Sequence, residues 1–221
     1  MERFSAPAMV LYGLTVTFAA FDLLMSLDPH WISTLFGAYY FVGSFYTALA
    51  LLAVLSCLGR RFMGMHQLIK PSCFHDLGKL YFAFCLLWAD FFYCQFLVIW
   101  YGNIPEETSY LIQRTMTLPW NRLAWAVFIL SFVIPFLLLI NKEVKTRPRF
   151  MIGLCSLVLV GIWLEHYLLL GPSLNPRADS IPISVSDVLI ALGFLGLMAM
   201  AVRFALARFP ELIPVQRQEV K

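Results

Sequence analysis

The stretch Leu123–Ile140 reads LAWAVFILSFVIPFLLLI and holds no charged side chain over 18 residues. A helix of about this length crosses the ~30 Å hydrocarbon core of a bilayer. A lone strand is excluded, because its backbone groups would remain unpaired in lipid. The stretch therefore predicts a transmembrane helix, and Pro135 is expected to kink it.

Five further apolar runs of similar length flank this one, and connectors rich in Pro, Gly or charge separate them. The six runs are Ala8–Met25, Leu35–Leu58, Leu80–Tyr101, Leu123–Ile140, Phe150–Leu170 and Val188–Leu206. The first run is longer than the apolar core of a typical signal peptide and lacks a convincing cleavage site, so we expect a helix there. The sequence predicts an all-α polytopic membrane protein, a bundle of six transmembrane helices forming one domain over residues 1–221.

The composition of the whole chain agrees with this prediction. Hydrophobic residues make up 61% and charged residues 13% of the 221 residues, and the mean hydropathy is +0.78. A soluble fold of this size cannot bury that much apolar surface, so a soluble enzyme, a secreted disulfide scaffold and a disordered chain are excluded. The sequence pI of about 8.6 does not indicate nucleic-acid binding, and the expected surroundings are a lipid bilayer.

Basic residues predict the orientation of the six spans. With six crossings, the N-terminus, the second and fourth connectors and the C-terminus share one side, which holds 13 of the 16 Lys and Arg residues. The opposite side holds only Arg114, Arg122 and Arg177. By the positive-inside rule both termini are expected in the cytoplasm.

No residue pattern indicates a metal or redox centre. The five cysteines, Cys57, Cys73, Cys85, Cys94 and Cys155, include no C-x-x-C pair, and we interpret them as small packing residues. Haem b would need paired histidines on facing helices, but His166 is the only histidine well inside a span. We expect neither a metal site nor a directly bound cofactor; quinone or quinol remains compatible with the chain.

One face of the third span carries charge. Asp90 lies midway along the span, where an ionised Asp costs about 3 kcal/mol. Asp76, Lys79 and Tyr101 fall within about 40° of the same face by helical rotation. This face is a candidate proton path; the alternative is a buried charge pair with interfacial anchoring.

A second group of polar residues is expected near the outer end of the bundle. Asp22, near the end of the first span, and Glu165 and His166, near the end of the fifth, share a depth, with Asp28 and His30 nearby. Adjacent helix residues point about 100° apart, so Glu165 and His166 should not share one partner closely. The group is either a titratable cluster or a set of interfacial residues that meet headgroups and water.

Two connectors have local explanations. Asp28-Pro29 is typical of a turn between the first two spans. Pro105, followed by Glu106 and Glu107, is typical of the first turn of a helix, where acids favour the positive end of the dipole.

Four longer strings resemble the membrane-integral F subunit of alternative complex III, a bacterial quinol:cytochrome c or quinol:acceptor oxidoreductase. They are GLTVTF at Gly13–Phe18, MSLDPHWISTLFG at Met25–Gly37, DLGKLYFAF at Asp76–Phe84 and QFLVIWYGNIPEET at Gln95–Thr108. The resemblance is strong from about Leu11 to Glu107 and weaker beyond. It assigns Asp28, His30, Glu106 and Glu107 to family-motif loops. The family has an aromatic residue where this chain has Asp90, so a role of Asp90 does not follow from the resemblance.

The resemblance implies a fold related to polysulfide-reductase membrane subunits. Family members have about ten helices, so a shortened chain, a split gene or a fragment lacking the amino-terminal portion is expected. It also implies a bacterial inner-membrane location and partner subunits that carry iron–sulfur clusters and cytochromes. Quinol oxidation in the family is assigned mainly to a sister subunit.

Three functions compete. The first is a non-haem membrane subunit of a respiratory quinol oxidoreductase, without a redox centre or catalytic residue of its own, contributing a proton pathway, a quinone-facing surface or complex integrity. The second is a free-standing proton channel or transporter, and the third is a structural membrane anchor. The proton-pathway candidates are Asp22, Asp76, Lys79, Asp90, Glu165 and His166.

Overall fold

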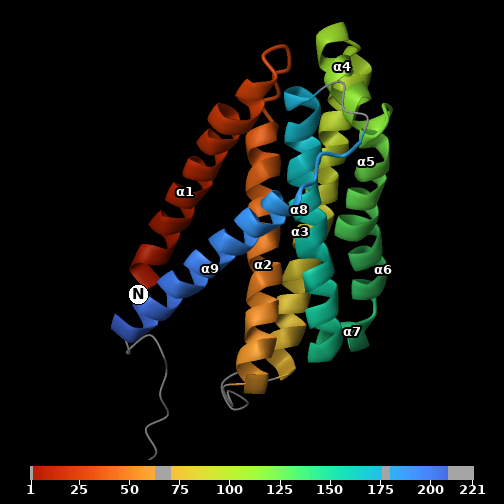
Figure 1. Ribbon diagram of the computed structural model, residues 1–221. Coiled ribbons are helices and arrows are strands. Elements are labelled where there is room, and N and C mark those ends of the chain that lie inside the picture. The colour runs from red at the N-terminus through yellow and green to blue at the C-terminus, as the bar shows by residue number, and fades with distance from the viewer. Residues whose placement is uncertain (1, 63–70, 176–179, 209–221) are drawn as a thin grey trace, which may run out of the picture. The chain divides into compact units, whose positions relative to one another are not determined.

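The computed structural model describes residues 2–62, 71–175 and 180–208, and within these ranges every regular element is helical (Figure 1). The elements are α1 (Glu2–Ala19), the π-helix η1 (Ala20–Leu24), the 3₁₀-helix η2 (Met25–Leu27), α2 (Phe36–Phe62), α3 (Pro71–Gly102), α4 (Pro105–Thr115), α5 (Trp120–Phe128), the π-helix η3 (Ile129–Val133), α6 (Ile134–Ile140), α7 (Lys142–Thr146), α8 (Pro148–Leu174) and α9 (Val185–Arg208). The all-α prediction is confirmed.

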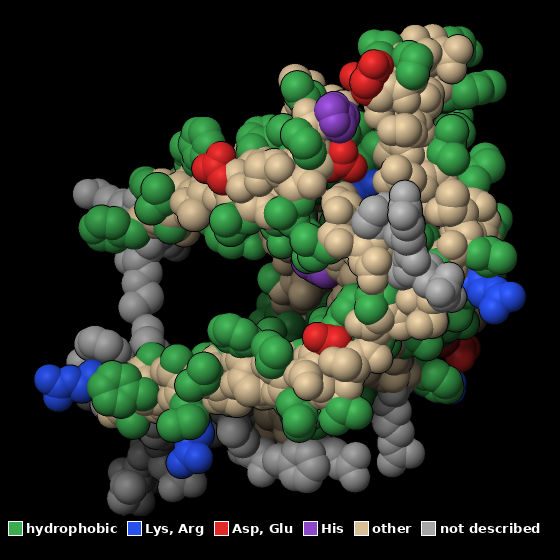
Figure 2. All heavy atoms as spheres, turned by 45° about the horizontal axis from the view of Figure 1, so that its top comes forward, with side chains coloured by type: hydrophobic (Ala, Val, Ile, Leu, Met, Phe, Trp, Pro, Cys, Tyr) green, Lys and Arg blue, Asp and Glu red, His purple; other side chains and the backbone are tan. Residues whose placement is uncertain are grey.

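Six helical segments are long and apolar enough to cross a membrane, and each contains most or all of one predicted run. They are Phe4–Leu27, Phe36–Arg60, Ser72–Gly102, Trp120–Ile140, Phe150–Leu174 and Val185–Ala205. Hydrophobic side chains dominate the face drawn in Figure 2, and charged side chains on it are few. The chain is thus a multi-pass integral membrane protein. Four basic residues used for the orientation, Lys70, Arg177, Arg217 and Lys221, lie outside the described residues.

The chain divides into two compact units, Met1–Ile181 and Pro182–Lys221. In the first unit α2 packs against α3 and α8, α5 packs against α8, and α1 packs against α2 (Figure 1). The second unit consists of α9 in its described part. The prediction of a single domain stays a prediction.

Pro135 shapes the middle of the fourth span. A proline lacks the N–H that would bond to the carbonyl four residues earlier, which belongs to Ser131. The π-helical turn η3 contains Ser131 and ends at Val133, just before α6 begins. The freed Ser131 carbonyl instead accepts a hydrogen bond of 3.1 Å from the phenol of Tyr46 on α2. The expected distortion at Pro135 is therefore a π-helical turn that bonds to a neighbouring helix.

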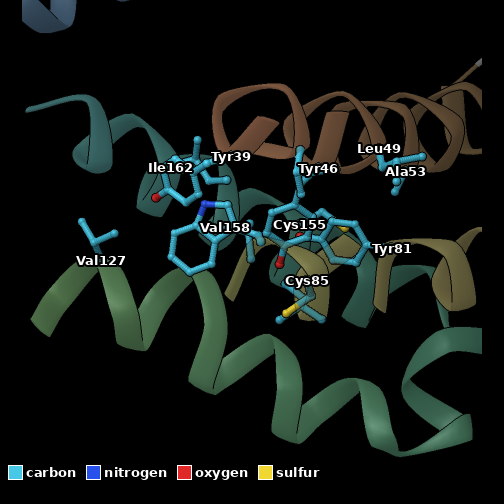
Figure 3. Close-up of a cluster of buried hydrophobic side chains, with 14 of the residues drawn as sticks. Tyr39, Tyr46, Leu49, Ala53, Tyr81, Cys85, Val127, Cys155, Val158 and Ile162 are labelled. Atoms are coloured by element: carbon cyan, nitrogen blue, oxygen red, sulfur yellow. The ribbon is translucent and has the colours of Figure 1, made fainter. Parts of the chain in front are cut away.

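The core beside η3 contains aromatic and sulfur side chains (Figure 3). The rings of Tyr46 and Tyr81 stack with centroids 4.8 Å apart, and Cys85 and Cys155 lie buried beside them. All five cysteines are free. The packing interpretation holds for the buried Cys57, Cys85 and Cys155, but it is wrong for Cys73, which is exposed because α3 turns that residue away from the bundle.

The connectors contain two short helices. α4 begins at Pro105, with Glu106 and Glu107 in its first turn, as the sequence predicted. α7 is capped by the side chain of Asn141, which accepts a 2.9 Å hydrogen bond from the Glu143 amide. Figure 1 shows α4 at the same end of the bundle as the α1–α2 connection, at the top of the view. We call this end the Asp28 end. α7 lies at the opposite end.

Candidate functional site

Glu165 is a buried carboxyl group on the fifth membrane span. It lies on α8, nine residues before the span ends at Leu174, or about 14 Å along the helix. Its Oε1 accepts a hydrogen bond from the phenol of Tyr39 on α2 and another, of 3.3 Å, from Nε1 of Trp88 on α3. Three helices thus meet at this one carboxyl group.

The partners of Glu165 are neutral. No Lys, Arg or His in the described ranges lies within ion-pair distance of its carboxylate oxygens. Removing a charged carboxylate from water is costly, and only two neutral donors offset that cost here. Glu165 therefore differs from a carboxylate that serves a structural salt bridge.

His166 faces a different partner, as the helical rotation predicted. Its Nε2 lies 3.3 Å from the hydroxyl of Tyr40, and its Nδ1 lies 2.7 Å from the carbonyl of Ile162 one turn earlier. A carbonyl oxygen can only accept a hydrogen bond, so Nδ1 carries the hydrogen that it donates to Ile162. In the neutral ring Nε2 then has no hydrogen and accepts from the hydroxyl of Tyr40. Two adjacent residues of α8 thus meet two adjacent tyrosines of α2.

Two cavities adjoin the pair formed by Glu165 and Tyr39. The first, called here the aromatic cavity, is partly open to the surface and lies among α2, α3, α4, α5 and α8. Its wall is mostly aromatic, with Phe36, Trp88, Phe92, Phe96, Tyr110 and Phe128 among the lining residues. The second, called here the polar cavity, is lined by Tyr40, Ser44, Thr47 and His166 as well as by the pair itself. Glu165 and Tyr39 therefore border an apolar cavity on one side and a more polar one on the other.

Two residues that line the aromatic cavity have a donor atom without a partner. Nε2 of Gln95 and Nε of Arg114 are buried and make no hydrogen bond with any described residue. Buried donors are normally paired, so these two nitrogen atoms are exceptions in the described structure. The cavity is apolar in its walls and offers hydrogen bonds at a few points, as small-molecule sites commonly do.

Arg114 closes the Asp28 end of this region. Its Nη2 donates to the carbonyl of Leu169 at 2.9 Å and to the hydroxyl of Ser173 at 2.6 Å. Its Nη1 lies 3.7 Å from the Asp28 carboxylate. The guanidinium group thereby joins α4 to α8 and to the connection between α1 and α2.

Aromatic stacking supports the same cluster. The guanidinium carbon of Arg114 lies 3.4 Å from the ring centroid of Tyr110, and that ring stacks on Trp31 with centroids 3.7 Å apart. Burial lowers the pKa of Arg114 and raises the pKa of Tyr110 to about 12. Tyr110 is therefore neutral at physiological pH, and its ring faces the cation with its negative face.

The structure does not assemble the second predicted group. Asp22 is exposed in η1 and His30 is exposed in the following turn, whereas Glu165 is buried between α2 and α3. Asp22 and His30 are therefore not among the hydrogen-bond partners of Glu165, which are Tyr39 and Trp88. The titratable cluster of Asp22, Asp28, His30, Glu165 and His166 stays a prediction. Shared depth along the bundle does not bring side chains together when they lie on different faces.

The charged face of α3 points away from the bundle. Asp76 and Lys79 form an exposed ion pair of 3.2 Å, and Asp90 and Tyr101 are exposed as well. These residues do not line the interior of the bundle, because Tyr81, Cys85 and Trp88 occupy the buried side of α3. The proton path along this face stays a prediction. Of the family-motif residues, Asp28 joins the Arg114 cluster, Glu106 is exposed and Glu107 is half-buried.

Sequence reasoning missed Tyr39, Tyr40, Trp88 and Arg114. The first three lie in long apolar runs where any aromatic residue is expected, so no local signal marks them. Arg114 is one of only three basic residues on its side of the predicted topology, which was the one available hint.

No protein-family model matches this sequence, and no curated protein matches it. In the described residues, no group of three or more His, Cys, Asp or Glu side chains is placed to hold a metal ion. Function is therefore inferred from the geometry around Glu165 and from the motif strings.

Proposed function

We propose that this chain is a non-haem membrane subunit of a bacterial respiratory quinol:acceptor oxidoreductase of the alternative complex III type. In that complex it handles protons at Glu165 and presents a quinone-facing surface. The observation that carries the proton role is the position of Glu165, buried at membrane depth between two cavities and bonded only to neutral donors.

The bonding of Glu165 favours proton transfer over a purely structural role. A carboxylate in a salt bridge or at a metal is held in its ionised form. A carboxyl group bonded to neutral groups can change its protonation state at a smaller cost in free energy. Tyr39 donates to Glu165, and the same residues border the cavity that contains Tyr40 and His166. A proton on Glu165 thus has the polar cavity as its route away from the aromatic one.

The aromatic cavity supports the quinone-facing surface. Its aromatic walls suit a flat apolar ring, and Gln95 and Arg114 are polar residues among those that line it. Glu165 borders the same cavity, so it is placed to accept a proton that a quinol releases there on oxidation. Partner subunits that carry iron–sulfur clusters and cytochromes supply the electron acceptors in this proposal.

The proposal includes a location and an orientation. The chain lies in the bacterial inner membrane with both termini in the cytoplasm, and the Asp28 end of the bundle faces outward. This orientation rests on the distribution of basic residues along the sequence.

The test is purification of the native complex from membranes carrying the wild-type chain or Glu165→Gln. The Gln side chain keeps the shape and one oxygen acceptor but cannot carry a proton. We expect co-purifying iron–sulfur and cytochrome subunits in both preparations, and a loss of quinol turnover or of proton release into vesicles in the variant only. Glu106→Gln, at an exposed residue, is the matched control.

Two results would favour the competing functions. Unchanged turnover and proton release in an assembled Glu165→Gln complex would make the chain a structural anchor. Proton conductance by the purified chain alone in vesicles, with no co-purifying redox subunits, would make it a free-standing channel.

A further inference from the structure

The aromatic cavity and the polar cavity meet at three residues. Tyr39, Glu165 and Leu169 line both cavities, and each other described residue that lines one of them does not line the other. We call these three residues the partition. A water molecule or an ion that moves directly between the two cavities therefore has to pass them.

The polar part of the partition is closed by a hydrogen bond. The phenol of Tyr39 donates to Oε1 of Glu165, and both residues are buried. Nε1 of Trp88, which lines only the aromatic cavity, donates to the same oxygen at 3.3 Å. The carboxyl group is thereby held between α2 and α3, where a proton can bind it from one cavity and leave it toward the other.

The apolar part of the partition is the side chain of Leu169. This residue lies one turn after Glu165 on α8, so the two side chains project from the same face of the helix. A leucine side chain offers no hydrogen bond, and water enters a buried space only where it finds polar partners. Leu169 therefore blocks the way between the cavities for water and for hydrated ions.

The backbone of Leu169 is held in place from the Asp28 end. Nη2 of Arg114 donates to the carbonyl of Leu169 at 2.9 Å and to the hydroxyl of Ser173, one turn later, at 2.6 Å. The preceding residue, Leu168, lines only the aromatic cavity, and both leucines are half-buried. Two adjacent leucines of similar burial thus differ in one respect, since only Leu169 borders the polar cavity.

We infer that Leu169 is the seal of the partition: its side chain keeps the two cavities separate for water and ions, so that only a proton bound to Glu165 crosses between them. Leu169 is a positioning residue that acts through Glu165 and takes no part in the chemistry. The seal prevents a released proton from returning to the aromatic cavity along a chain of water molecules. The part of Glu165 as proton carrier rests on the proposed function, whereas the separation of the cavities by Leu169 does not.

The first test measures the access of water to Trp88 in the purified full-length chain in detergent. The indole N–H of Trp88 is buried beside the aromatic cavity and does not border the polar one. Leu169→Ala opens the partition, so water from the polar cavity should speed the exchange of this N–H in D₂O by about tenfold or more. Leu168→Ala, the matched control, should exchange like wild type. NMR of ¹⁵N-labelled tryptophan follows the six indole N–H groups, and Trp88→Phe assigns the signal.

Two further measurements separate the seal from a general loosening of the bundle. Leu169→Met keeps the size of the side chain and should exchange like wild type at Trp88. Trp31 is buried and lines neither cavity, so its indole N–H should exchange at the same rate in all of these proteins. Equal acceleration at Trp31 and Trp88 in Leu169→Ala would show that the whole bundle opens, and it would overturn the seal.

The second test uses the native complex in vesicles. In Leu169→Ala the ratio of protons released to quinol oxidised should fall by about twofold, because water then carries protons back through the partition. Leu168→Ala changes only the wall of the aromatic cavity, so it should raise the KM for quinol and keep the ratio. A loss of turnover with an unchanged ratio in Leu169→Ala would assign Leu169 to the cavity wall and overturn the seal.

The outcomes separate the seal from the proposed function. Equal exchange of the Trp88 N–H in Leu169→Ala and wild type overturns the seal, even if redox subunits co-purify with the chain. Selective acceleration in Leu169→Ala, together with a native preparation that contains no redox subunit, supports the seal and contradicts the proposed function.

Discussion

The phenol of Tyr46 donates a 3.1 Å hydrogen bond to the carbonyl of Ser131, across the contact between α2 and the π-helical turn η3. The carbonyl is free to accept because Pro135, four residues later, has no N–H to donate to it. The bond therefore links a local defect in the fourth span to a specific residue of the second. It joins two helices at a depth where water is scarce.

This relationship predicts a coupled effect of two substitutions. Tyr46→Phe removes this donor and leaves the Ser131 carbonyl with only the weak 3.9 Å contact from Sγ of Cys85, so it should lower stability by about 1 kcal/mol. Pro135→Ala restores a backbone N–H for that carbonyl, so Tyr46→Phe should cost clearly less in the Pro135→Ala background. Thermal unfolding of the four proteins in detergent measures the coupling. Additive effects would mean that Tyr46 stabilises the bundle by packing alone.

Gly171 and Gly153 make a matched pair on α8. A Cβ atom at Gly171 would lie 2.1 Å from Cη2 of Trp120, whereas one at Gly153 would meet nothing within 4 Å. Gly171→Ala should therefore destabilise the chain by about 1–3 kcal/mol through overpacking. Gly153→Ala should be neutral or slightly stabilising, since Ala favours a helix over Gly. Similar unfolding temperatures for both variants would contradict the close contact between Trp120 and α8.

Arg114 is expected to hold the Asp28 end of the bundle together. Arg114→Leu leaves the carbonyl of Leu169 and the carboxylate of Asp28 without this donor, and should cost about 2–4 kcal/mol of stability. Arg114→Lys keeps the charge but not the forked geometry, so it should restore only part of the loss. Arg122→Leu, at an exposed residue of α5, is the control. Protease resistance of the α4 segment in the intact chain measures the effect, and equal digestion of all four proteins would contradict it.

The orientation of the spans makes a prediction of its own. Alkaline phosphatase is active only outside the cytoplasm, so a fusion at Arg177 should be active and a fusion at Lys145 inactive. The reason is the 13-to-3 distribution of Lys and Arg between the two sides. Enzyme activity normalised to fusion protein level is the measurement. The reverse pattern would place both termini outside.

A final prediction concerns the neighbours of Glu165. Tyr39→Phe removes one of its two donors while keeping the ring, so it should change the pH profile of proton release by the native complex. Tyr40→Phe removes the contact with His166 but leaves both donors to Glu165 in place, so its pH profile should remain closer to wild type. The ratio of protons released to quinol oxidised, measured from pH 6 to 9, distinguishes the two variants. Identical profiles for both would argue against Glu165 as the titrating group.

The six spans and the helix start at Pro105 were determined by the sequence alone. Both follow from local properties: a run of about 20 apolar residues has no stable alternative to a helix in lipid, and a proline followed by two acids suits a first helical turn. The separate directions of Glu165 and His166 followed from helical rotation in the same way.

Tertiary structure alone decided which face of each helix points inward. In a soluble helix the polar side reveals the exposed face, but in a membrane both the lipid-facing and the protein-facing sides are apolar. The sequence therefore could not show that Asp90 points away from the bundle while Glu165 points into it. Nor could it show that Tyr39, Trp88 and Glu165 meet, because these residues are far apart along the chain and only the packing of α2, α3 and α8 brings them together.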